Sequence, residues 1–335
     1  MSLAVEQGAS LQPWNTFGVQ AHAERFVQVH NDDELRQALA LAEHNGWPVR
    51  VIGGGSNLVL ARDVAGLVIR MASRGIRVLG DGLVEAEAGE PWHPFVQYTL
   101  AQGLAGLENL SLIPGTVGAA PMQNVGAYGV EVKDVFAGLT ALDRHSGELR
   151  EFSLSECEFG YRDSRFKREA GRWVILRVRF RLSAEAPLHL DYGPVRQRLA
   201  EQGIDAPTAQ DVSRAICSIR QEKLPDPAVL GNAGSFFKNP VIPQAQADAL
   251  RERYPDLVSY PLPGGEAKLA AGWLIDKAGW RGYRDGAVGV HALQALVLVN
   301  HGGATGAQVL GLAERVQADV RERFGVMLEM EPNVL

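Results

Sequence analysis

The sequence predicts a protein of mixed helices and strands, divided into two or three domains. Its 335 residues exceed the length of one ordinary domain. Residues 15–71 show a strand–helix–strand pattern of the βαβ type around a glycine-rich loop. Strand patterns dominate from there to residue 182, and helical patterns are more frequent after residue 184. Strand-rich and helix-rich parts therefore follow one another along the chain.

Composition excludes several classes of function. Hydrophobic residues make up 46% of the chain and charged residues 21%, which is typical of a soluble globular protein. The net charge of −6 without a basic tract argues against a nucleic-acid or membrane-surface role. Cys157 and Cys217 stand alone, and the histidines lack ligand spacing, so we expect neither disulfides nor a metal site. Without an apolar leader, we expect a cytoplasmic protein.

The first unit begins with a strand at residues 23–30. Asn31 and Glu34 form a capping-box pattern, which predicts a helix that ends near Asn45. The apolar run of residues 47–52 is the next strand, and it leads directly into the glycine-rich loop.

That loop reads Gly53-Gly54-Gly55-Ser56-Asn57-Leu58. Glycine has no Cβ, so backbone N–H groups can converge on an anion such as a pyrophosphate. Gly53 and Gly55 match the first two glycines of the dinucleotide fingerprint, but Leu58 replaces the third and no helix pattern follows. A tight turn without a ligand is the alternative.

A second Gly/Pro-rich stretch, residues 114–129, is too irregular for a core element and too apolar for a free linker. Two such loops suggest one extended cofactor held from both sides. From the residues alone, a nucleotide- or flavin-binding enzyme is the interpretation.

The remaining elements follow from periodicity and turn signals. A hairpin is predicted around Gly80-Asp81-Gly82 and a helix at about residues 92–101. Further strands are predicted at residues 135–143, 148–152, 173–182, 288–300 and 326–331. Helices are predicted at residues 194–202, 209–222, 244–253, 267–278 and 306–323.

Four places carry candidate chemistry. Arg162, in a Tyr-Arg-Asp-Ser sequence, could grip a carboxylate, or it could be a surface arginine paired with Asp163. Ser235, between a glycine and two phenylalanines, could donate a proton or simply serve a turn. Lys223 could bind a ligand or interact with a helix C-terminus. Glu329 and Glu331 share one strand face, which could be a buried acid site or a solvated edge.

Eight motifs in register resemble those of the UDP-N-acetylenolpyruvoylglucosamine reductases of peptidoglycan synthesis. The resemblance covers nearly the whole chain, from about Asn15 to Glu331. The motifs lie at residues 15–17, 53–60, 113–118, 123–129, 160–164, 223–225, 231–240 and 328–331.

The resemblance implies an α+β flavin fold of the vanillyl-alcohol-oxidase (PCMH) type, with non-covalent FAD between two α+β subdomains and a third α+β domain for the substrate. The first FAD-binding subdomain corresponds to residues 1–72 with a C-terminal strand in 325–335. The second is 73–205, and the substrate-binding domain is 206–324. The residues assigned to FAD are Gly53, Gly54, Gly55, Ser56, Asn57, Leu58, Pro114, Gly115, Thr116, Gly118, Gln123, Asn124, Gly126, Ala127 and Tyr128.

The resemblance also implies the reaction and its catalytic residues. In the family NADPH reduces FAD, and the reduced flavin sends hydride to the enolpyruvyl double bond, giving UDP-N-acetylmuramate. Arg162 and Glu331 would stabilise the charge that develops beside the carboxylate, and Ser235 would supply the proton. Pro332 directly after Glu331 removes a ladder donor, which leaves Glu329 as the substitute acid.

Substrate contacts and partners are carried over in the same way. NADPH and the UDP-sugar are expected to take turns in one cleft of a monomer, with neither nucleic acid nor membrane as a partner. The residues assigned to the substrate are Tyr161, Tyr192, Lys223, Asn239 and Gln294.

Two alternatives remain at this point. A flavin oxidase of the same fold would use oxygen, and its covalently flavinylated relatives carry His or Cys in or beside the glycine loop. Residues 53–57 contain neither, so denaturation should release the flavin. A non-catalytic sugar-nucleotide-binding protein would not need Arg162, Ser235 and Glu331 together.

Overall fold

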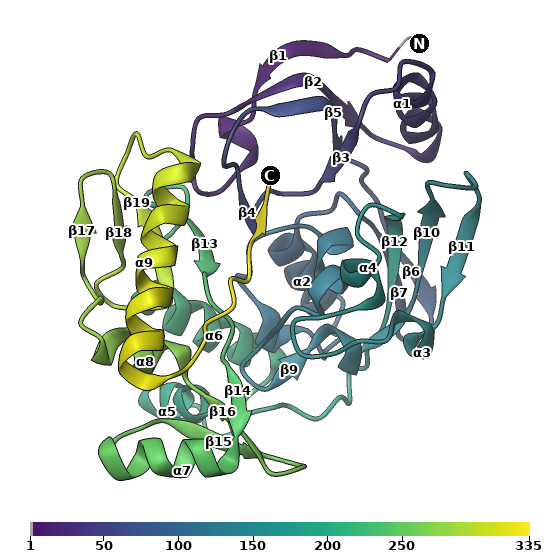
Figure 1. Ribbon diagram of the computed structural model, residues 1–335. Helices are drawn as coiled ribbons and strands as arrows, with labels where there is room; N and C mark the ends of the chain where they lie inside the picture. The colour runs from purple at the N-terminus through teal and green to yellow at the C-terminus, as the bar shows by residue number, and fades with distance from the viewer. Residues whose placement is uncertain (1–2) are drawn as a thin grey trace. The chain divides into compact units, whose positions relative to one another are not determined.

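A computed structural model describes residues 3–335 of the chain (Figure 1). Its internal contacts group the chain into two compact units. Unit 1 holds the residues up to 9 together with 23–55 and 64–222, and unit 2 holds residues 10–22, 56–63 and 223–335. The three-domain division of the sequence stays a prediction.

The first sheet of unit 1 is built around a parallel core, as the βαβ-type pattern predicts. Its strands, in spatial order, are β1 (Glu6–Ser10), β2 (His22–Val29), β5 (Val64–Met71) and β3 (Val49–Ile52), and both β2 and β3 run parallel to β5. Helix α1 (Asp32–His44) begins where the Asn31 Oδ1 accepts the Glu34 N–H at 2.9 Å. The Glu34 carboxylate accepts the His30 N–H at 2.7 Å, one residue before the position of a standard capping box.

The second sheet of unit 1 is antiparallel. Its order is β11 (Leu149–Phe152), β10 (Phe136–Asp143), β12 (Trp173–Arg181), β7 (Leu83–Glu87) and β6 (Ile76–Gly80). The β6–β7 hairpin confirms the turn predicted at Gly80-Asp81-Gly82. Helix α2 (Trp92–Ala101) buries Trp92 and Phe95 in a cluster with Phe180, the Phe95 and Phe180 ring centroids being 5.2 Å apart.

Four more helices, several 3₁₀ turns and a small hairpin complete unit 1. Helices α3 (Leu154–Cys157) and α4 (Arg165–Arg168) join β11 to β12. Turns of 3₁₀ type occupy Glu108–Leu110, Val117–Gln123 and Val132–Asp134, and a small hairpin pairs β8 (Gly126–Ala127) with β9 (Val130–Glu131). Helices α5 (Gly193–Glu201) and α6 (Ala209–Lys223) share a separate small core.

Unit 2 contains two further antiparallel sheets. The first has the order β13 (Gly231–Ser235), β19 (Val297–Asn300), β18 (Val288–Val290) and β17 (Arg284–Asp285), and the second β14 (Val241–Pro243), β16 (Glu266–Leu269) and β15 (Ser259–Leu262). Its helices are α7 (Gln244–Arg253), α8 (Ala271–Lys277) and α9 (Gly306–Phe324). Helix α9 packs on α8, β18 and β19 (Figure 1), and Thr305 with Gln308 caps its start.

Three predicted elements were wrong. Residues 266–269 form β16, so the helix predicted over 267–278 starts only at Ala271, because pairing with β14 and β15 overrides the local helical pattern. The strand predicted over 288–300 is two strands, β18 and β19, joined by a turn.

The third error concerns the chain end. Residues 326–331 are irregular apart from a bridge between Met330 and Phe237. The strand lies later, at β20 (Asn333–Val334), beyond Pro332, and it pairs in parallel with β4 (Leu58–Val59) (Figure 1).

Across residues 3–335, no helix combines the length and hydropathy that crossing a bilayer requires.

The aromatic cluster under α2 gives a stability prediction. Phe95 is fully buried, so Phe95→Ala should lower the free energy of unfolding by about 3–5 kcal/mol. Leu149, in the edge strand β11 of the second sheet, is 45% exposed. Leu149→Ala should lower the free energy of unfolding by about 0.5 kcal/mol or less. Urea titrations followed by circular dichroism compare the two variants; equal losses would contradict this account of the core.

Candidate functional site

In unit 1 the two glycine-rich loops lie directly against each other. A Cβ placed on Gly53 would lie 2.6 Å from the Thr116 Oγ1, and one on Gly54 would lie 3.2 Å from the Gly115 Cα. Both contacts are closer than side chains normally allow, so only glycine lets the first loop approach the second this closely. The structure therefore brings two of the segments assigned to one cofactor into contact.

The second loop is held in place by side-chain hydrogen bonds to backbone. Asn124 is fully buried and has φ +46°; its Nδ2 donates to the Glu131 carboxylate at 3.0 Å and to the Gly160 carbonyl at 3.1 Å, and its Oδ1 accepts the Lys133 N–H at 3.0 Å. The Ser164 hydroxyl, also buried, donates to the Met122 carbonyl at 2.6 Å. These bonds attach the Tyr-Arg-Asp-Ser turn to the second loop.

Arg162 projects from that turn towards the second loop. Its Nη2 donates to the Gly126 carbonyl at 2.8 Å, and its guanidinium carbon lies 5.4 Å from the Tyr161 ring centroid. Its backbone has φ +53°, an uncommon conformation for a residue with a side chain. Asp163 forms its ion pair with Arg168.

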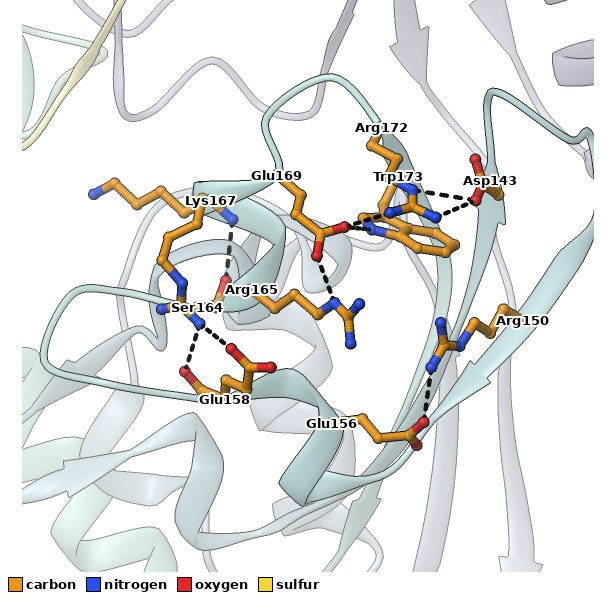
Figure 2. Close-up of polar contacts among 11 residues, drawn as sticks. Asp143, Arg150, Glu156, Glu158, Ser164, Arg165, Lys167, Glu169, Arg172 and Trp173 are labelled. Carbon is orange, nitrogen blue, oxygen red and sulfur yellow. Dashed lines mark hydrogen bonds and ion pairs between the residues drawn. The ribbon is translucent and has the colours of Figure 1, made fainter.

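A network of charged side chains surrounds the short helix α4, which follows the turn in the chain (Figure 2). The Glu169 carboxylate accepts from the Trp173 Nε1 at 2.7 Å and the Arg165 Nε at 2.8 Å, and these bonds lower the pKa of Glu169. Arg172 bridges Glu169 and Asp143, at 3.2 and 3.1 Å. A helix of four residues is not stable alone. These contacts therefore hold α4 in place directly after the turn that carries Arg162.

Tyr128 and Tyr192, assigned to cofactor and substrate respectively, touch within unit 1. Their ring centroids are 5.5 Å apart in an edge-to-face arrangement, and Tyr192 is 52% exposed. Arg220 of α6 donates a hydrogen bond to the Tyr128 phenol. Burial raises the pKa of that phenol, so it stays protonated at neutral pH.

In unit 2 backbone pairing places Glu331 beside the segment of Ser235. The Phe236 N–H donates to the Leu296 carbonyl at 2.7 Å, and the Phe236 carbonyl accepts the Glu331 N–H at 2.9 Å. Asn57, from the end of the glycine loop, donates its side-chain amide to the Glu331 carbonyl at 3.4 Å. The proposed proton donor and the proposed acid therefore flank one residue of backbone.

Glu329 and Glu331 differ in surroundings. The Glu329 side chain is 70% exposed and forms an ion pair with Lys238, and its carbonyl accepts the Lys238 N–H at 2.9 Å. Glu331 as a residue is only partly exposed. The environment favours Glu331 over Glu329 as the acid.

Two residues assigned to the substrate, Asn239 and Gln294, each lie near the start of α8. The Asn239 Oδ1 accepts the Ala271 N–H at 2.9 Å, and a Cβ on Gly272 would lie 3.4 Å from the Gln294 Oε1. Because the Asn239 oxygen is committed to the helix, its amide nitrogen is the group left to face a ligand. Lys223 ends α6 and is exposed.

The Asn15-Thr16-Phe17 motif supports the strand that carries Ser235. The Thr16 carbonyl accepts the Asn232 N–H at 3.0 Å, and the Phe17 carbonyl accepts the Asn300 Nδ2 at 2.8 Å. A Cβ on Gly231 would lie 2.2 Å from the Phe17 carbonyl oxygen, which explains glycine at that position.

Comparison with known proteins identifies the family. A model of the C-terminal domain of UDP-N-acetylenolpyruvoylglucosamine reductase matches residues 226–335, and an FAD binding domain model matches residues 23–153. The UDP-N-acetylenolpyruvoylglucosamine reductase of Pseudomonas fluorescens (strain Pf0-1) is 67% identical over 337 residues, 99% of each chain. That of Pseudomonas aeruginosa is 67% identical over 338 residues, 100% of each. The chain belongs to the UDP-N-acetylenolpyruvoylglucosamine reductase family.

A solved structure supports the same fold. The UDP-N-acetylenolpyruvylglucosamine reductase of Thermus caldophilus aligns over 100% of this chain and 99% of its own, with 26% identity and a TM-score of 0.69. The predicted α+β fold class and the family resemblance are confirmed.

The residues present fit FAD, the cofactor of the matching domain. Residues 23–153 include both glycine-rich loops, and because Gly53 and Gly54 carry no side chain, the backbone of the first loop lies close to Thr116 and Gly115 of the second. Backbone N–H groups of such loops suit a pyrophosphate, because they converge without carrying a charge that must be balanced elsewhere. Residues 53–57 with 114–128 are the segments that would hold it.

The sequence reasoning missed residues that act through others. Asn109 and Arg220 both form hydrogen bonds to Tyr128, yet neither stands in one of the motifs singled out from the sequence. For Arg220 a signal existed, because it follows Val212, Ile216 and Ile219 on a helix whose buried residues are mostly apolar.

Contact between the loops predicts that Gly53→Ala weakens FAD binding. The added methyl must displace Thr116, whose β-branched side chain has few alternatives, so affinity should fall about tenfold to a hundredfold. Flavin absorbance retained after gel filtration measures this. Gly311→Ala, in α9 with open space around it, is the control. Full retention by Gly53→Ala would show that the loop contact does not serve the cofactor.

Proposed function

We propose that this chain reduces UDP-N-acetylenolpyruvoylglucosamine to UDP-N-acetylmuramate, a step of peptidoglycan precursor synthesis, with NADPH as the reductant and non-covalent FAD as the cofactor. The observation that carries the proposal is 67% identity, over almost the entire chain, to reductases named for this substrate. The enzyme is accordingly a UDP-N-acetylmuramate dehydrogenase, and we propose that it works as a monomer in the cytoplasm.

The reaction adds two electrons and two hydrogens across a carbon–carbon double bond. FAD, when bound, supplies the two-electron chemistry, being reduced by NADPH and reoxidised by the substrate. The chain must bind the UDP-sugar, stabilise negative charge on the carbon that bears the carboxylate, and protonate that carbon. Each task is assigned to residues of this chain.

Ser235 is the proposed proton donor. It ends β13 at an exposed position, directly after Gly234 with φ +70° and before the buried Phe236 and Phe237. Buried rings on its C-terminal side and strand pairing behind it restrict where its hydroxyl can point. A hydroxyl held in this way can deliver a proton to one carbon.

Arg162 and Glu331 are the proposed stabilisers of the developing charge. A guanidinium remains charged at every working pH, and its fork matches the two oxygens of a carboxylate. The Arg162 backbone is in a strained conformation, and its bond to Gly126 fixes the side-chain direction before substrate arrives. Glu331 can contribute a hydrogen bond only in its protonated form.

The remaining assignments concern the UDP-sugar. Tyr192 offers an exposed phenol, Lys223 an exposed ammonium group, and Asn239 and Gln294 side-chain amides at the start of α8. Tyr161 is 37% exposed and lies against Arg162. An ammonium group, a phenol and amides suit a diphosphate and a sugar.

Anaerobic stopped-flow absorbance tests the reaction and the role of Ser235 together. NADPH should bleach the flavin in the wild type and in Ser235→Ala alike, because proton donation to substrate plays no part in that half-reaction. Reoxidation by UDP-N-acetylenolpyruvoylglucosamine should be about a hundredfold to ten-thousandfold slower in Ser235→Ala.

Ser259→Ala, in β15, is the matched control and should reoxidise at the wild-type rate. Equally fast reoxidation by Ser235→Ala would remove Ser235 from the mechanism. Wild-type flavin that is restored only by oxygen would replace the reductase by the oxidase alternative.

A second pair of variants distinguishes the two glutamates. Glu331→Ala should lower kcat for the UDP-sugar on the order of a hundredfold or more, the usual effect of losing a group that stabilises the transition state. Glu329→Ala removes the ion pair with Lys238, in which the Glu329 side chain is 70% exposed, and should leave kcat within about twofold. Steady-state assays of NADPH oxidation measure both; the opposite ranking would make Glu329 the acid.

A further inference from the structure

Asn109 is a buried amide whose bonds go to two distant pieces of backbone. It lies in the 3₁₀ turn Glu108–Leu110 and is 1% exposed. Its Nδ2 donates to the Tyr128 carbonyl at 2.9 Å and to the His189 carbonyl at 2.9 Å. Both acceptors are carbonyl oxygens, so the amide nitrogen, and not the amide oxygen, must face them.

The oxygen atom of the same amide does not explain why asparagine stands here. Within residues 3–335 the Asn109 Oδ1 is buried and finds no hydrogen-bond donor. A buried acceptor without a partner costs free energy, and an apolar side chain of similar size would avoid that cost. An asparagine here is therefore explained by its two N–H bonds, which join residue 128 to residue 189.

Tyr128, the first residue held, is constrained on three sides. Its φ is +50°, its phenol receives a hydrogen bond from Arg220, and its ring meets the edge of the Tyr192 ring at 5.5 Å. Asn109 adds a bond to its carbonyl. A tyrosine held in a strained backbone conformation by this many contacts presents its ring in one orientation.

His189, the second residue held, precedes Tyr192 by three residues. Tyr192 occupies the N-cap position of α5, without a side-chain capping bond. Leu188, Leu190 and Tyr128 pack on the small core shared by α5 and α6, which is separate from the main core of unit 1. The ring contact with Tyr128 and the hydrogen bond from Asn109 to His189 therefore both act on the position of Tyr192.

We propose that Asn109 is a positioning residue for Tyr192, setting the phenol for the UDP-sugar by fixing both the ring on which Tyr192 rests and the backbone that leads to it. The inference rests on the proposed contact between Tyr192 and the substrate. Asn109 itself touches neither substrate nor cofactor in this account. Its loss should raise KM for the UDP-sugar.

A double-mutant cycle tests the proposal on the FAD-containing enzyme. Asn109→Asp keeps the side-chain shape but turns an acceptor towards two carbonyls, and Asn109→Ser removes one donor with a smaller, uncharged group. Asn109→Asp and Tyr192→Phe should each raise KM for the UDP-sugar on the order of tenfold, with Asn109→Ser intermediate. In the Tyr192→Phe background, Asn109→Asp should change KM by less than about twofold, because no phenol is left to position.

Gln210→Ala is the matched control. It removes another side-chain amide bond to a carbonyl in unit 1, that of Leu100 at 3.3 Å, and should leave KM within about twofold. Independent, multiplicative KM effects of the Asn109 and Tyr192 substitutions would overturn the inference and leave the role of Tyr192 intact. An unchanged KM in Tyr192→Phe would overturn both.

Hydrogen exchange keeps the proposal testable if Asn109→Asp folds poorly. In Asn109→Ser, amide exchange measured by mass spectrometry should rise in residues 186–193 and stay at the wild-type level in β12. Faster exchange throughout unit 1 would show a general structural role for Asn109 and would overturn the proposal.

Discussion

The hydrogen bonds of Asn124 are the constraint on which the rest of the candidate site in unit 1 depends. One buried amide contacts the hairpin at Glu131, the backbone at Lys133 and the Tyr-Arg-Asp-Ser turn at Gly160. One side chain thereby joins the second loop, the stretch that contains Glu131 and Lys133, and the Tyr-Arg-Asp-Ser turn. Asparagine suits this position because it tolerates a positive φ better than most residues and offers both donor and acceptor.

In unit 2, mostly backbone hydrogen bonds hold the segments of Ser235 and Glu331 in place. Strand β13 is held on one side by β19 and on the other by the Asn15–Gly18 turn, where Asn15 donates to the Leu11 and Val19 carbonyls. The chain end then adds Glu331 alongside Phe236. The last residues of the sequence are therefore tied to residues almost a hundred positions earlier, which local pattern alone does not reveal.

Sequence reasoning predicted elements well where one local signal decided them. Asn31 with Glu34 marked α1, and Gly80-Asp81-Gly82 marked a hairpin. It failed at residues 266–269, where strand pairing with β14 and β15 outweighed a helical pattern. It also failed at residues 326–331, which do not form the predicted strand. For the site, the motifs of the family resemblance singled out Arg162 and Ser235, whose roles stay proposals. Nothing local marked Asn109, whose partners lie 19 and 80 residues away.

Uncommon backbone conformations are concentrated in and beside the segments of the candidate site. Six non-glycine residues among residues 3–335 have positive φ, and four of them, Leu112, Asn124, Tyr128 and Arg162, lie in or beside segments assigned to FAD or catalysis. Each such conformation costs of order 1–3 kcal/mol.

A specific bond accompanies each of the four. The His93 Nδ1 accepts the Leu112 N–H at 2.9 Å, Asn124 uses its own amide, Asn109 holds Tyr128, and Gly126 receives the Arg162 guanidinium. Burial lowers the pKa of His93, which keeps its ring neutral and able to accept. At each of the four places a hydrogen bond therefore accompanies a backbone conformation that costs free energy by itself. The residues that hold the backbone are thus as much part of the site as those that face the ligand.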